Sequence, residues 1–169
     1  MAVSLVTHLE FSRSEFKRVL VDLPPEDAVV RIKPMNCISW MVGHLANHEQ
    51  SYWLILGQKK TAVPDLADWV GYGQPATTPP LADMLSAWDT ITAQADPFLA
   101  TLTEADLSKN WVHADGRVQG ETVGMMFMRL IYHYWFHIGE IHAVRQQLGH
   151  KNIPDFVGDM EMIRPLYSD

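Results

Sequence analysis

Apolar residues recur at intervals of three and four in four separate stretches of the chain, which is the spacing of one face of an α-helix. The first stretch covers residues 4–22, and the prolines of the following sequence LPPED end it. The second covers residues 36–57, where Asn36 is the expected N-cap and Gly57 the expected end. Both stretches are long enough to form helices of several turns.

Two further stretches complete the pattern. The third opens at the pair Pro79-Pro80, and we expect Pro97 to kink or shorten its helix. The fourth begins at Glu121 or Thr122 and ends at Gly149. The sequence therefore predicts four amphipathic helices, and each has an apolar face that must be buried.

The connections are unequal in length. The segment 58–80 is rich in turn-forming residues and long for a bundle, and loops of this length are often functional, so Trp69 and Tyr72 are candidates to cover a pocket. Asp115-Gly116 lies between short β-prone runs and predicts a small hairpin before the fourth helix. Residues 150–169 form a tail with one short helical turn.

Four amphipathic helices without a long alternating strand pattern predict an all-α four-helix bundle. A chain of 169 residues is suited to one domain, which we expect to span residues 1–169. The single cysteine, Cys37, rules out an internal disulfide framework and is compatible with a reducing cytoplasm. We expect Cys37 to be a small buried hydrophobe rather than a reactive thiol.

The charge pattern narrows the choice of partners. The net charge is −7 and the 13 lysines and arginines are scattered, so nucleic acid is an unsuitable partner. The N-terminal sequence has no basic region followed by an apolar block, and no apolar run reaches the roughly 20 residues of a membrane span. We therefore expect a cytoplasmic protein that is not bound to a membrane and that acts on a small molecule.

Histidines lie on the inner faces of two of these helices. His44 and His48 share the inward stripe of the second helix, and His133 and His137 share that of the fourth. A buried imidazole without a partner costs roughly 1–3 kcal/mol, so each ring needs a ligand or a hydrogen bond. Two histidines at positions i and i+4 can bind one divalent cation together, and Glu140, one turn on, could be a ligand, orient a ring or exchange a proton.

The alternative to a metal site is a set of core histidines that satisfy one another or bind neighbouring carbonyl groups. One H-x-x-x-H pair alone is weak support for a metal. Two such pairs on different helices strengthen it, because each core histidine would otherwise need its own buried partner, and both interpretations stay open.

The segments SWMVGHLANHEQSYWLILG, HYWFHIGEIHAVRQQLG and PDFVGDM resemble the DinB-like superfamily over nearly the whole chain, particularly its branch related to thiol-dependent transferases. The resemblance implies a four-helix bundle in up-down-down-up order that holds a divalent metal, often zinc or nickel. It implies His44, His133 and His137 as the metal ligands, and it leaves His48 as an accessory residue one turn away. It also implies a low-molecular-weight thiol such as bacillithiol or mycothiol as cofactor, and a homodimer.

These features predict a metal-dependent enzyme that activates a thiol for attack on a small electrophile. A second hypothesis is hydrolysis by metal-bound water, with Glu140 or His48 moving the proton. A third is a non-catalytic metal-binding or small-molecule-binding protein of a stress response, and the last is a purely structural bundle. Arg145 is expected to pair with an acidic residue of the tail, or with a carboxylate of the thiol cofactor.

Overall fold

The computed structural model describes residues 3–155 and 157–168 of the chain and consists of helices and the segments that join them. The motif residue Phe156 lies outside the described residues. In chain order the elements are α1 Ser4–Val19, α2 Pro25–Ala28, α3 Ile38–Glu49, the π-helix η1 Gln50–Leu56, α4 Leu66–Val70, α5 Leu81–Leu99, the 3-10 helix η2 Glu104–Asp106, α6 Val123–Gln147 and the 3-10 helix η3 Met160–Leu166.

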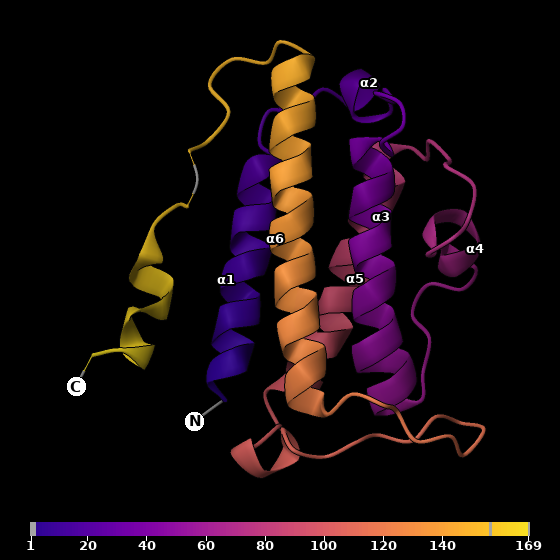
Figure 1. The fold of residues 1–169 in the computed structure, drawn as a ribbon, viewed down its shortest axis with the longest axis vertical. Helices are drawn as coiled ribbons and strands as arrows, with labels where there is room; N and C mark the ends of the chain where they lie inside the picture. Colours follow the sequence, from indigo (N-terminus) through magenta and orange to yellow (C-terminus); the bar gives the residue numbers. More distant parts are fainter. Residues whose placement is uncertain (1–2, 156, 169) are drawn as a thin grey trace.

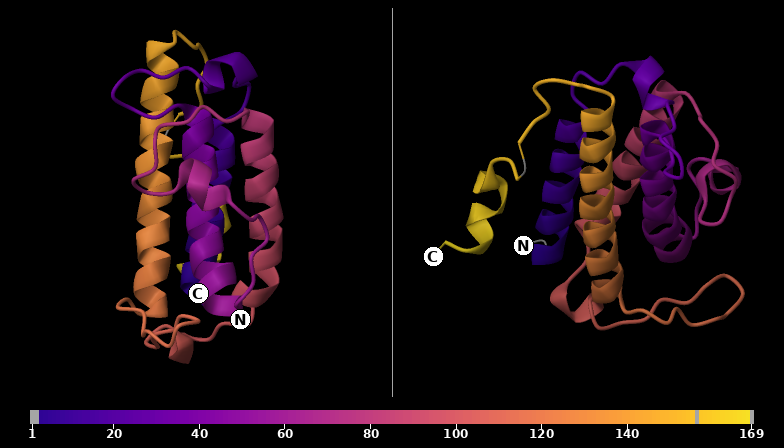
Figure 2. Two further views of the ribbon diagram at one scale, coloured as in Figure 1. Left: turned by 90° about the vertical axis from the view of Figure 1, so that its right-hand side faces the viewer. Right: turned by 45° about the horizontal axis from the view of Figure 1, so that its top comes forward.

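The four long helices form a bundle around one apolar core (Figure 1). α1 packs along α6 and α3 packs along α5, and a contact between α3 and α6 joins the two pairs. The views in Figure 2 show α4 on the outer side of α3 and η3 beyond α1. The predicted all-α class is therefore confirmed, and α3 and α6, the two helices that carry the histidine pairs, are neighbours.

The boundaries of the fourth helix follow the sequence signals. The Thr122 hydroxyl accepts a hydrogen bond from the backbone nitrogen of Met125 at 3.3 Å, which is an N-cap contact. Gly149 follows the helix with φ of 82°, a conformation that favours glycine. α5 accommodates Pro97 within its last turn and ends two residues later, at Leu99.

The second helix differs from the prediction at its N-cap and in the geometry of its last turns, whereas Gly57 caps the helical run as expected. Cys37, not Asn36, is its N-cap, and its sulfur accepts a hydrogen bond from the backbone nitrogen of Trp40 at 3.4 Å. From Gln50 onward the helix widens into the π-helix η1, which shifts the inward face. Ile55, which at regular α-helical spacing would share a face with His48, is 45% exposed.

The connections contain more structure than predicted in one place and less in another. The long segment after the second helix is not wholly loop, because α4 lies within it. The predicted hairpin is reduced to a single antiparallel bridge between Val112 and Val118, with Gly116 at φ of 85° in the turn. The expected helical turn of the tail is present as η3.

A buried polar network ties the four long helices together beside the histidines. Arg13 of α1 donates two hydrogen bonds of 2.7 Å to the carboxylate of Glu49 in α3 and one of 2.6 Å to Asp96 in α5. The Tyr134 hydroxyl of α6 donates to Glu49 at 2.8 Å and accepts from Nε1 of Trp88 at 2.7 Å. Because Glu49 follows His48 and Tyr134 follows His133 in the chain, this network fixes the backbone that carries both histidines.

No helix within the described part of the chain is long and apolar enough to cross a membrane.

Candidate metal centre

Three histidine side chains, which we call the triad, converge where α3 faces α6. His44 comes from α3, and His133 and His137 come from successive turns of α6. One ligand atom from each ring lies within 4.8 Å of the others. The ring centroids are 4.6–5.5 Å apart, so the three rings enclose a common point.

The hydrogen bonds behind two of these rings determine where their lone pairs point. Nδ1 of His44 lies 2.7 Å from the backbone oxygen of Val70, which can only accept, so this nitrogen carries the ring hydrogen. Nδ1 of His137 donates in the same way to Oε2 of Glu140 at 2.7 Å. In a neutral ring the other nitrogen is then bare, so Nε2 of both histidines presents a lone pair to the common point.

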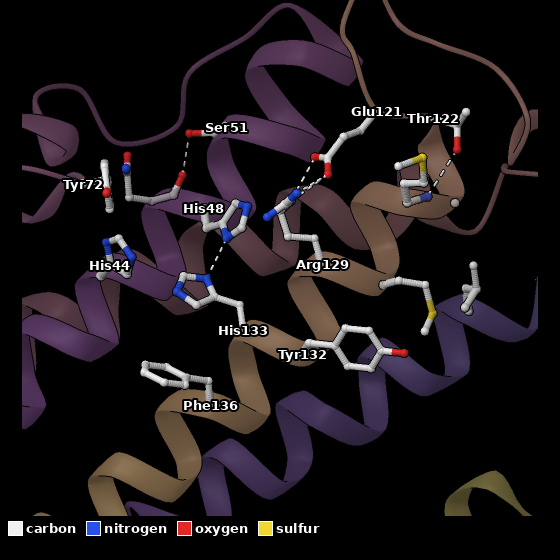
Figure 3. Close-up of a pocket in the computed structure, with 15 residues that line it drawn as sticks. His44, His48, Ser51, Tyr72, Glu121, Thr122, Arg129, Tyr132, His133 and Phe136 are labelled. Carbon is white, nitrogen blue, oxygen red and sulfur yellow. Dashed lines mark hydrogen bonds and ion pairs between the residues drawn. The ribbon is translucent and has the colours of Figure 1, made fainter.

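The third ring makes contact with a fourth histidine. Nε2 of His133 lies 2.9 Å from the bare Nε2 of His137, so in the metal-free chain His133 donates this hydrogen bond. Its Nδ1 lies 2.7 Å from Nδ1 of His48 and accepts a hydrogen bond from that ring. His48 therefore contacts a ring of the triad without being one of the three converging ligands (Figure 3).

The surroundings hold these imidazoles in the neutral form that binds metals. Burial, followed by the charges of neighbouring histidines, lowers the pKa of His133 to about 2. Burial also lowers the pKa of His48 to about 4, and it lowers that of His44 despite the opposing hydrogen bond to Val70. Protons therefore do not compete with a metal for the ring nitrogens of His44 and His133 near neutral pH.

The residues fit a divalent cation. Zinc binds histidine nitrogen at about 2.0–2.1 Å, so small side-chain rotations bring three nitrogens that lie within 4.8 Å onto one ion. The far side of each ring is held by an oxygen or nitrogen partner, which is the usual arrangement around metal-ligating histidines. Three protein ligands also leave coordination positions open, as in catalytic zinc sites.

Two hollows open onto the histidines from different sides. The larger, of about 1170 Å³, runs along the groove between α3 and α6, and the smaller, of about 400 Å³, is bordered by residues near the start of α3 and by Glu140. Both are lined by His44, Tyr72, His133 and Phe136. The triad therefore lies at the junction of two binding spaces.

The sequence did not point to the ion pair that lines the larger hollow. Arg129 donates from Nε and Nη2 to the carboxylate of Glu121 (Figure 3). The Tyr52 hydroxyl donates to the same carboxylate at 3.1 Å. The hydrogen bond from Arg129, against the opposing effect of burial, keeps the pKa of Glu121 below its usual range. The available signal was the position of Arg129, one turn before His133 on the same side of α6.

Of the remaining predicted site residues, only Tyr72 lines the hollows beside the histidines. Tyr72 is 98% exposed and lines both hollows, whereas Trp69 lines neither. Arg145 is 2% exposed and lines neither hollow; it donates to the backbone oxygen of Val19 at 2.6 Å and to His150 at 3.1 Å. Its predicted partners, an acidic residue of the tail or a thiol carboxylate, are thus replaced by contacts that join the ends of α1 and α6.

Comparisons with known proteins agree with this architecture. The sequence profile of the DinB superfamily matches residues 8–141. The crystal structure of a DinB-like protein from Bacillus cereus ATCC 10987 is similar with a TM-score of 0.58 at 18% identity, over 86% of this chain and 89% of that one. No curated protein matches the chain. With the profile covering most of its length, the chain belongs to the DinB superfamily.

Proposed function

We propose that the protein is a metal-dependent transferase that joins a low-molecular-weight thiol to a small electrophile. The observation that carries the proposal is the junction itself, where three converging imidazoles lie between two adjoining hollows. A transfer between two organic molecules needs two binding spaces at one reacting point. Hydrolysis needs one such space and access for water.

His44, His133 and His137 would hold one divalent ion, and zinc and nickel both suit a set of neutral imidazoles. When bound, the metal lowers the pKa of a coordinated thiol and so supplies a thiolate at neutral pH. In the transfer a carbon–sulfur bond forms, the bond from that carbon to its leaving group breaks, and the leaving group departs with the electron pair. The thiol proton passes to solvent.

We assign His48 and Glu140 to positioning rather than to proton transfer. Each is hydrogen-bonded at 2.7 Å to the outer nitrogen of a proposed ligand, His48 to His133 and Glu140 to His137. Such partners fix the orientation and tautomer of a ligating ring. Because both groups are committed to this contact, they support hydrolysis less well than transfer.

Metal analysis of tag-free protein tests the site. We expect about one divalent ion per chain in the wild type, and none in the double variant His133→Ala, His137→Ala. The matched control, His8→Ala with His113→Ala, removes two histidines that line neither hollow and should keep the ion. An ion retained fully in the first double variant would contradict the proposed ligands.

Turnover assays test the reaction. The metal-loaded protein is incubated with an alkyl halide or an epoxide, together with a panel of thiols that includes bacillithiol, mycothiol and cysteine. The proposal predicts product that depends on both the thiol and the metal. Turnover without any thiol would favour a metal-dependent hydrolase, and metal binding with no turnover in any combination would favour a non-catalytic binding protein.

A further inference from the structure

The larger hollow extends well beyond the space that a metal-bound thiol needs. It follows α6 from Phe136, beside the triad, back to Thr122 at the start of the helix. From His133 to Met125 is eight residues, or about 12 Å along the helix axis at 1.5 Å per residue. The groove is therefore elongated, with the histidines toward one end.

The wall formed by α6 is apolar and open. Met125, Tyr132 and Phe136 line the groove and are 52%, 61% and 60% exposed. Met128 lines the same wall and is half-buried. Large apolar side chains gathered along one groove favour an apolar occupant, because contact with it removes their surface from water.

The opposite wall and the charges restrict the occupant further. α3 and η1 contribute the polar side chains Asn47 and Ser51. The charged side chains among the residues that line the groove are Glu121 and Arg129, and these two neutralise each other in an ion pair of 2.5 Å. Because no described residue of its lining is an unpaired cation, this groove is unsuited to a phosphate or a polyanion.

We propose that the groove binds a linear aliphatic chain whose polar, metal-ligating head group lies at the histidines. The placement of the head group rests on the proposed function, whereas the placement of the aliphatic chain rests on the groove alone. Tyr132 and Phe136 flank the first part of the chain, and Met125 and Met128 contact its far part. The methionines are suited to this because their flexible thioethers adapt to an irregular apolar ligand.

The first test asks whether the groove binds an aliphatic chain that has no metal-ligating head group. Protein as purified, labelled with carbon-13 in its methionine methyl groups, is titrated with 1-hexanol and followed by NMR. Saturable shifts are expected for Met125 and Met128. Met160 and Met162 on η3 serve as the matched control, since they are 51% and 46% exposed but line neither hollow. Absence of shifts at Met125 and Met128, or equal shifts at all four residues, would overturn the proposal.

The same spectra also test a rival occupant. If the methyl signals of Met125 and Met128 move with protein concentration in the absence of hexanol, a second copy of the chain covers this face. That outcome would replace the aliphatic ligand with a homodimer contact.

The second test adds the head group. Zinc-loaded protein is titrated calorimetrically with alkyl hydroxamates from acetohydroxamate to octanohydroxamate, and affinity should rise up to about fourfold for each buried methylene. The double variant Tyr132→Ser, Phe136→Ser should flatten this rise. No rise with chain length in the wild type would refute the groove assignment. Failure of acetohydroxamate itself to bind would instead count against the metal site. The methyl shifts with 1-hexanol would still show whether the groove binds an aliphatic chain.

Discussion

Each imidazole of the candidate centre is oriented by one contact on its far side. For His44 and His137 the contact is an oxygen acceptor, which leaves Nε2 bare. For His133 it is another imidazole, and an imidazole can either donate or accept. In the metal-free chain His48 donates to His133. A metal held by Nε2 of His133 would require that ring's hydrogen on Nδ1, so His48 would have to become the acceptor.

This exchange predicts a specific effect of removing His48. His48→Ala should weaken metal binding about 10- to 100-fold, since removal of the partner that orients a ligating histidine has effects of this size. His48→Gln offers both an acceptor and a donor and should stay near the wild-type affinity. Competition with a chelator measures the affinities, and nitrogen-15 chemical shifts should show the ring hydrogen of His48 moving from Nδ1 to Nε2 on metal addition. Equal affinity in the wild type and the alanine variant would refute the positioning role.

A second prediction at this scale concerns the buried ion pair. The Glu49 side chain is 0% exposed and accepts two hydrogen bonds from Arg13, whereas Asp96, which binds the same guanidinium, is 56% exposed. Glu49→Gln should therefore lower the free energy of unfolding by about 3–5 kcal/mol. Asp96→Asn, the matched control, should cost at most about 1 kcal/mol. Urea denaturation measures both, and similar losses in the two variants would contradict the assigned difference in burial.

At the scale of the helices, a close approach between α3 and α5 positions the first histidine. A β-carbon added at Gly43 would lie 2.3 Å from the sulfur of Met84 and 3.2 Å from a methyl group of Val70. The absence of a side chain at Gly43 thus allows Met84 of α5 to pack directly on α3. It also allows Val70, whose backbone oxygen accepts the hydrogen bond from His44, to do the same. Gly139 of α6 is also helical, but a β-carbon there would meet nothing within 4 Å.

These two glycines provide a matched pair. Gly43→Ala should lower the free energy of unfolding by about 1–3 kcal/mol through overpacking. Gly139→Ala should raise it by about 0.5–1 kcal/mol because alanine has the higher helix propensity. Thermal or urea denaturation distinguishes the two. A stabilising Gly43→Ala would show that α3 and α5 have room between them.

The sequence was sufficient for features that depend on local periodicity. Residues four apart in a helix share a face, so the pairing of His133 with His137 and the inward direction of His44 followed from spacing alone. The π-helical turn after Glu49 and the partners of Arg145 could not be predicted, because they depend on packing between distant segments. The contact of His48 with His133 has the same origin, since the two rings come from different helices.

At the scale of the whole molecule, the candidate centre joins two helices that meet over a limited area. α3 and α6 pack less extensively on each other than either does on its main neighbour. A cation held by His44 on one side and by His133 and His137 on the other would therefore cross-link the two halves of the bundle. Ligand binding to the folded chain alone stabilises it by mass action.

This linkage predicts a rise in melting temperature on metal addition. At a free metal concentration about 100 times Kd the stabilisation is about 2.7 kcal/mol. For a chain of 169 residues this corresponds to roughly 5–10 °C, at about 2–4 °C per kcal/mol. Calorimetry with and without a chelator measures the shift. The variant His44→Ala should lose most of it, and a full shift in that variant would mean that the cation binds elsewhere.

The central claim is that one divalent cation binds where the three imidazoles converge. Anomalous-difference X-ray data, collected from metal-loaded crystals on both sides of the absorption edge of the metal, test it most directly because they locate the ion and identify its element. We expect a single strong peak about 2.0–2.2 Å from a ring nitrogen of each of His44, His133 and His137. A peak that lacks contact with any one of these rings, or no peak between α3 and α6, would contradict it.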